Sequence, residues 1–139
     1  MKPLRGAMAI LATALPLFAV AADEDAVAKA KVAAQAWLML ADAHDGAKTW
    51  LGAASYFQAA VTQENWQRSL TAVRAPLGAV KTRSLKTATF TRSLPGAPDG
   101  EYVVIQYATV FEKKASALET ITPMKEKDGS WKVSGYFIK

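Results

Sequence analysis

The chain has 139 residues but no cysteine, and its only histidine is His44. The lack of cysteine excludes disulfides, thiolate zinc sites and a thiol nucleophile, and a lone histidine excludes any site that needs two imidazoles. Charged residues make up only 21%, whereas hydrophobic residues make up 51%, so long disordered segments are not expected. The length and composition therefore indicate a single folded domain.

Sequence patterns of common active sites are also missing. The chain contains no glycine-rich phosphate loop, no Ser-x-x-Lys, no Gly-x-Ser-x-Gly and no His-Glu-x-x-His motif. The formal net charge is +5, but the basic residues are scattered among acidic ones and form no run, which disfavours nucleic-acid binding. We therefore predict no catalytic constellation, no cofactor, no metal and no nucleic-acid partner.

The first 21 residues are typical of a secretory signal. Lys2 and Arg5 form a positive head, an uncharged stretch of 17 residues follows, and small residues lead up to Ala21. We expect cleavage after Ala21, which leaves one domain over 22–139, exported to the periplasm or secreted, with membrane contact only through the leader. An uncleaved anchor is the alternative, but a spanning helix needs about 20 apolar residues.

The first half of the remaining chain has helical periodicity. Apolar and alanine residues recur every three or four positions over 25–43, and Asp45 with the glycine after it is expected to stop this helix. A second helical segment is expected over 47–60. Thr62 is a suitable N-cap for a third segment that ends at Arg74, before a proline and a glycine.

The second half has the composition of β-strands. Apolar residues on both parities of 101–111 predict a central strand covered on both faces, and Asp128 with Gly129 predicts a hairpin turn. Helices followed by an antiparallel meander indicate an α+β fold, with the N-terminal helices packed on a curved, cone-like sheet of about four strands. The expected strands are 82–91, 101–111, 117–125 and 131–138.

Several short stretches together resemble a known bacterial family. They are Trp66 and the segments 74–78, 94–104, 119–124 and 128–136. In this order they closely resemble the exported bacterial proteins of the domain of unknown function 4019 family. The resemblance implies a Gram-negative periplasmic or secreted location and no particular activity. By topology alone, the order of elements is also similar to the cone-shaped folds of nuclear-transport-factor-two-like and cystatin-like proteins.

Few residues are candidates for chemistry. His44 lies between Asp42 and Asp45, where it would act as a general base oriented by a carboxylate, or simply lie solvated at a helix C-terminus, which we favour. These three residues do not make a metal site, because they cannot all point at one ion from a regular helix. Arg68, Arg74 and Arg83 are expected to pair with nearby carboxylates or to cover apolar surface rather than to bind an anionic envelope component.

A ligand pocket would draw on aromatic and polar residues of the predicted helices and strands. The four tryptophans are expected to be core residues, although a cone-like fold can leave an aromatic-lined hollow. A buried Glu119 would have a raised pKa and serve as a proton shuttle, but an exposed carboxylate on a sheet face is favoured. The candidates for such a pocket are Trp37, Trp66, Gln106, Tyr107, Glu119 and Tyr136.

Three functions are consistent with these features. The first is a non-catalytic binding or accessory domain, whose partner is an unknown protein or small molecule. The alternative is a small enzyme of the isomerase or dehydratase type, which needs only one carboxylate or His44 in an apolar pocket. The third is a homodimer that pairs through an exposed sheet face.

Overall fold

A computed structural model describes residues 3, 13 and 16–139 of the chain. The positive head of the expected leader, Lys2 and Arg5, and most of its apolar stretch lie outside the described residues. The first helix, α1, spans Leu17–Asp42 and so includes the expected cleavage position at Ala21. Within the described part of the chain, no helix has both the length and the hydropathy that crossing a membrane requires.

Helix α1 is the central packing element of the domain. Small residues at helical spacing, among them Ala30, Ala34 and Ala41, are buried with Trp37 and Leu38 on the face that meets the sheet. Alanine at these positions lets the helix approach the strands closely. The sequence predicted a start at residue 25, but the helix continues to Leu17, where Leu17 and Phe18 are largely exposed.

Three shorter helices follow α1. They are α2 (Gly46–Leu51), α3 (Ser55–Ala60) and α4 (Gln63–Arg74), and a 3-10 turn, η1 (Ala75–Leu77), leads into the sheet. The prediction of one helix over 47–60 was wrong. The chain is extended at Ala54, whose N–H donates to the Val133 carbonyl at 2.8 Å, so a tertiary contact overrides the local helical periodicity.

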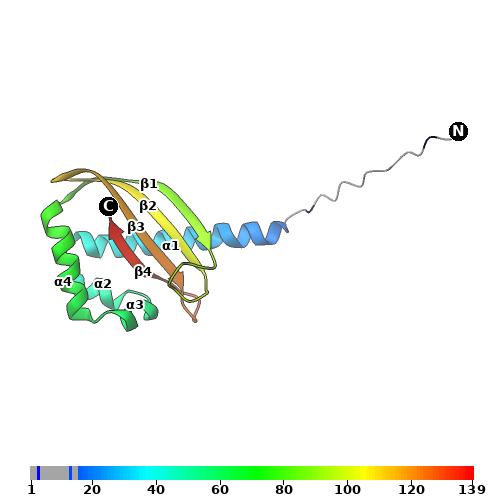
Figure 1. Cartoon of the computed structure of the whole chain (residues 1–139), viewed down its shortest axis with the longest axis horizontal. Helices are drawn as coiled ribbons and strands as arrows, with labels where there is room; N and C mark the ends of the chain where they lie inside the picture. The colour runs from blue at the N-terminus through cyan, green and yellow to red at the C-terminus, as the bar shows by residue number, and fades with distance from the viewer. Residues whose placement is uncertain (1–2, 4–12, 14–15) are drawn as a thin grey trace.

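The four strands form one antiparallel sheet in the order β1-β2-β3-β4. Each consecutive pair of strands is antiparallel, as the predicted meander requires, and Figure 1 shows α1 lying across the sheet while α4 lies beyond its end. The α+β fold with four strands is therefore confirmed. The strands are β1 (Val80–Thr91), β2 (Tyr102–Phe111), β3 (Lys114–Lys125) and β4 (Trp131–Ile138).

The hydrophobic core lies between α1 and one face of the sheet. Val103, Ile105 and Tyr107 of β2 face Trp37 and the alanines of α1 within this core. Among the alternate residues of β2, Val104 and Val110 are only half-buried and Ala108 is exposed. Only Tyr102 is buried, and its hydroxyl donates to the Pro98 carbonyl of the preceding loop rather than meeting a helix. The prediction that this strand is covered on both faces was therefore wrong: β2 is central in the sheet, but helices cover one face only.

Candidate functional site

A buried network of polar side chains lies at the end of the sheet where α1 stops. One residue comes from each of six elements, namely two helices and all four strands. Their polar atoms are joined by hydrogen bonds and ion pairs. The network consists of Asp42 of α1, Arg74 of α4, Arg83 of β1, Thr109 of β2, Glu119 of β3 and Tyr136 of β4.

Arg83 is the centre of this network because it bridges two carboxylates. Its Nε and Nη2 donate to the two oxygens of Glu119 at 2.7 and 3.2 Å. Its Nη1 and Nη2 donate to the two oxygens of Asp42 at 2.8 and 2.9 Å. The planar guanidinium can donate two hydrogen bonds to each of the two carboxylates at once, whereas a lysine ammonium cannot.

Glu119 is fully buried and accepts four hydrogen bonds. Besides the two from Arg83, Thr109 Oγ1 donates to Oε1 at 2.5 Å and the Tyr136 hydroxyl donates to Oε2. A carboxylate offers about four lone-pair sites, so all of its accepting capacity is in use. The expectation that Glu119 is an exposed carboxylate on a sheet face was wrong.

Asp42 joins this cluster to a second arginine. Arg74 Nη2 donates to Asp42 Oδ1 at 2.9 Å, and the Arg74 guanidinium carbon lies 5.1 Å from the ring centroid of Phe111. Arg74 is only 1% exposed, and its Nε and Nη1 have no partner among the described residues. Two cations therefore balance two anions; Arg74 and Glu119 are shielded from water, whereas the Asp42 side chain is still 32% exposed.

The network shifts the proton affinity of its members. Burial would raise the pKa of Asp42, but the hydrogen bonds and charges of Arg83 and Arg74 outweigh it and hold that pKa below its usual range. Burial, and after it the charge of Glu119, raises the pKa of the Tyr136 hydroxyl. Tyr136 therefore stays protonated and keeps donating to Glu119.

Beside the network lies an apolar hollow that we call the α4–β4 slot. Its volume is about 260 Å³, and it is open on one side. Tyr136 belongs to both features, because its ring lines the slot while its hydroxyl reaches Glu119. The slot is lined by Trp66, Ser69, Leu70 and Val73 of α4 and by Tyr136, Phe137 and Ile138 of β4.

Comparison with family models decides what kind of protein carries this slot. The model described as "Protein of unknown function (DUF4019)" matches residues 33–136, a range that includes all six residues of the network. The chain belongs to this family. Comparison with curated proteins and with solved structures gave no match. The topological likeness to cone-shaped folds therefore stays a prediction for this DUF4019 member.

The slot and the network bring together three of the candidate residues of this DUF4019 member. Trp66 and Tyr136 line the slot, and Glu119 lies directly behind Tyr136. Tyr107 is buried opposite Glu119 on the neighbouring strand, and its hydroxyl has no partner among the described residues. Gln106 lies on the other face of the sheet, where its Oε1 accepts from the Thr87 hydroxyl at 3.2 Å.

Trp37 and Trp66 are held in fixed positions by one buried threonine. Thr49 is fully buried; its carbonyl accepts from Trp37 Nε1 and its hydroxyl accepts from Trp66 Nε1, both at 2.9 Å. Trp37 also lines a separate hollow of about 290 Å³ with Trp131. These indoles are thus partly core residues, as expected, and partly the walls of surface hollows.

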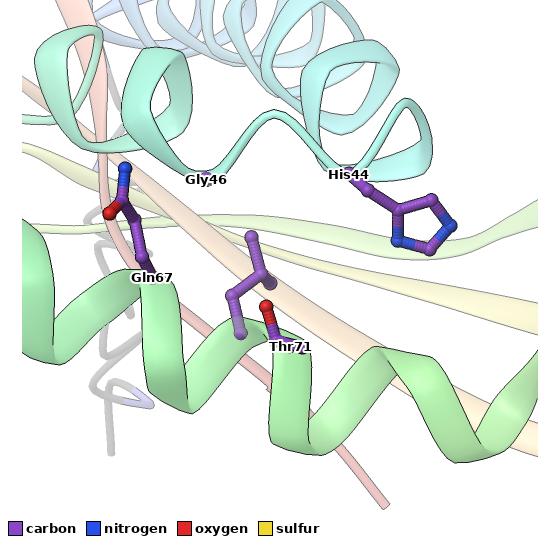
Figure 2. Close-up of a pocket in the computed structure, with 5 residues that line it drawn as sticks. His44, Gly46, Gln67 and Thr71 are labelled. Atoms are coloured by element: carbon purple, nitrogen blue, oxygen red, sulfur yellow. The ribbon is translucent and has the colours of Figure 1, made fainter.

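His44 lies apart from the network. It lines a third hollow, of about 260 Å³, with Gly46, Gln67 and Thr71, and Figure 2 shows its ring directed away from Gln67. The carboxylate of Asp42 is held by the two arginines, so it does not orient the imidazole. In the described part of the chain, no group of three or more acidic or histidine residues is placed to hold a metal ion.

Sequence reasoning missed the way the network is assembled. Asp42 was not predicted to be the carboxylate that Arg74 and Arg83 share, and Thr109 was not considered at all. One signal was available: Glu119 has the same strand parity as Ile121 and Ala117, so it belongs to the buried face of β3. A charged residue at an inward position needs a partner of opposite charge, and Arg83 on the edge strand supplies it.

Proposed function

We propose that this chain is an exported, non-catalytic binding domain and that its ligand site is the α4–β4 slot. The observation that carries the proposal is the character of this slot. It is open, largely apolar, and bordered by Trp66 and Tyr136, both of which are anchored from behind by hydrogen bonds. Apolar walls with a few fixed polar groups are what a binding site requires.

The buried network supports binding rather than catalysis. A general base needs a free lone pair within reach of a substrate proton. Both oxygens of Glu119 are fully engaged by Arg83, Thr109 and Tyr136, and Glu119 does not line the slot. Its role is to hold Tyr136 in place, so the isomerase or dehydratase alternative loses its leading candidate for a base.

Export is the other part of the proposal. Leu17 and Phe18, at the start of α1, are 86% and 88% exposed. Such residues suit a leader that is removed before the domain functions. Sequencing the N-terminus of the protein recovered from the periplasm or medium tests this: a start at Ala22 is expected, and a start at Met1 would contradict it.

Binding in the slot can be measured with the uncharged dye Nile red, which fluoresces in apolar surroundings. We expect saturable binding to the wild type, weakened at least about tenfold by Val73→Lys, because the lysine places a charge at the apolar rim. Ala72→Lys is the matched control, since Ala72 is exposed on the same helix but does not line the slot.

Two results would count against this function. Equal binding of Nile red to the wild type and to Val73→Lys would place the dye elsewhere, and an absence of binding would remove the slot as an apolar site. Isomerisation of a β,γ-unsaturated cyclic ketone by the wild type would favour the enzyme alternative instead.

A further inference from the structure

The α4–β4 slot lies along the edge of the sheet, because β4 is the last strand in the order β1-β2-β3-β4. Three consecutive residues of this edge strand line it, Tyr136 to Ile138. A hollow that follows an edge strand exposes main-chain groups as well as side chains. Its ligand can therefore be recognised by backbone hydrogen bonds, which a purely apolar pocket does not offer.

The hydrogen-bond ladder shows which backbone groups of β4 point outward. Leu118 and Lys139 exchange two hydrogen bonds, N to O at 3.0 and 2.9 Å. Because bonded and non-bonded pairs alternate in an antiparallel ladder, Phe137 bonds β3 while Tyr136 and Ile138 turn their N–H and C=O groups away from it. Among the described residues, no backbone hydrogen bond outside the sheet reaches Tyr136 or Ile138.

The same edge already accepts a strand-like segment of this chain. Ala53 forms an isolated parallel bridge with Val133, and the Ala54 N–H donates to the Val133 carbonyl. The chain then leaves the edge, because α3 begins at Ser55. Pairing of this segment with β4 therefore ends at Val133. It does not reach Tyr136 and Ile138, whose outward-facing N–H and C=O groups lie further along the same edge.

The opposite edge of the sheet is protected against pairing. Strand β1 carries Lys81 and Lys86 and has two register irregularities against β2. Charged side chains and bulges are the usual means by which edge strands avoid pairing with other chains. The stretch from Tyr136 to Ile138 has no charged side chain and faces an apolar helix surface instead.

The dimensions of the slot also suit a polypeptide segment. Its volume is about 260 Å³, and it is open to solvent. That space suits the side chains of an added strand, which would point alternately into the slot and out to solvent. Val73 and Phe137, 46% and 58% exposed, lie where such a strand would pass.

We propose that the α4–β4 slot binds an extended peptide segment that pairs with the free edge of β4 at Tyr136 and Ile138 and places apolar side chains against Trp66, Leu70 and Val73. This inference rests on the proposed function and names its ligand class. Main-chain hydrogen bonds supply affinity in this mode of recognition, and the apolar wall of α4 selects the side chains.

The test begins with a library of random nonapeptides displayed on phage and panned against the full chain. We expect enriched peptides that lack proline and have apolar residues at alternate positions. The best of these, as a synthetic peptide, should slow hydrogen exchange of the Tyr136 and Ile138 amides at least about tenfold, since both amides become hydrogen-bonded. The Phe137 amide, already bonded to β3, is the internal reference.

Backbone methylation separates strand pairing from side-chain insertion. Methylating the peptide amides that face β4 should abolish binding, whereas methylating the alternate amides should not. Val73→Lys should lose the peptide, and Ala72→Lys should keep it. Equal tolerance of both methylation patterns, or unchanged exchange at Tyr136 and Ile138, would overturn the inference.

The outcome with Nile red distinguishes the two proposals. If the dye binds the slot but no peptide is enriched, the slot is a small-molecule site: the proposed function stands and the peptide inference fails. If neither the dye nor any peptide binds, both fail.

Discussion

Arg83 and Glu119 form a buried ion pair across the width of a strand. The Arg83 Nε lies 2.7 Å from Glu119 Oε1, although one residue is on β1 and the other on β3, with β2 between them. The Thr109 hydroxyl of β2 completes the connection. This pair links the edge strand β1 to Glu119, which also accepts from the Tyr136 hydroxyl of β4. The polar network is therefore connected directly to a residue that lines the candidate binding site.

Replacing Glu119 by glutamine should destabilise the domain strongly. The change keeps the shape of the side chain but leaves Arg83 buried with one carboxylate partner, which costs about 3 kcal/mol in the free energy of unfolding. Urea denaturation followed by circular dichroism measures this. Glu112→Gln, at an exposed position, should change stability by less than about 0.5 kcal/mol. Equal effects of both variants would contradict a stabilising role of the pair.

Asp42 should make the stability of the domain depend on pH. Its pKa in the folded chain lies below the usual value of 3.8, because Arg83 and Arg74 outweigh the effect of burial. The unfolded chain therefore takes up the proton first as the pH falls. The stabilisation is present above about pH 5 and is lost as the pH falls through the folded pKa.

The measurement is the free energy of unfolding between pH 6 and pH 3, values that bracket the usual carboxylate range. Asp42→Asn should show a shallower decline than the wild type, since its amide does not titrate. Asp99→Asn, in the exposed loop before β2, should decline as the wild type does. A slope unaltered by Asp42→Asn would show that Asp42 has no part in the acid sensitivity.

Thr49 should control the position of the tryptophan that lines the slot. Thr49→Val keeps the side-chain volume but removes the hydroxyl that accepts from Trp66 Nε1 and donates to the Gly46 carbonyl. We expect a loss of about 1–3 kcal/mol and weaker Nile red binding. Thr71→Val, at an exposed position on α4, is the control; if it weakened dye binding as much, the hydrogen bond would not be the cause.

His44 should be a site where glycine stabilises the fold. It has a φ of 58°, and its N–H and that of Asp45 donate to the carbonyls of Ala41 and Leu40 in the way that ends many helices. A residue with a Cβ in this conformation costs roughly 1 kcal/mol. His44→Gly should therefore raise stability by about that amount in thermal unfolding, whereas His44→Ala, which keeps the Cβ, should not.

The overall fold could be predicted from the sequence because it follows local patterns. Thr62 caps α4 as expected, accepting from the Asn65 N–H at 3.2 Å, and the turn at Gly129 joins β3 to β4. The break between α2 and α3 could not be predicted in this way. It depends on Val133, a residue distant in sequence whose carbonyl holds Ala54 in an extended conformation.

The candidate site was only partly predictable, and for the same reason. Aromatic residues such as Trp66 and Tyr136 could be chosen as pocket candidates by their chemistry alone. That Glu119 meets Arg83 depends on the register of β1, β2 and β3, and an irregularity in β1 between Leu85 and Thr87 alters that register. Strand parity alone does not reveal such a bulge.

The polar network also has a consequence for how the chain folds. Its members lie far apart along the sequence, from Asp42 near the end of α1 to Tyr136 in the last strand. Such distant groups meet only after long loops have closed, so the charges come together late on the folding pathway. Glu119→Gln should then leave the refolding rate nearly unaltered and accelerate unfolding. The network would thus act mainly by lowering the unfolding rate of the assembled domain.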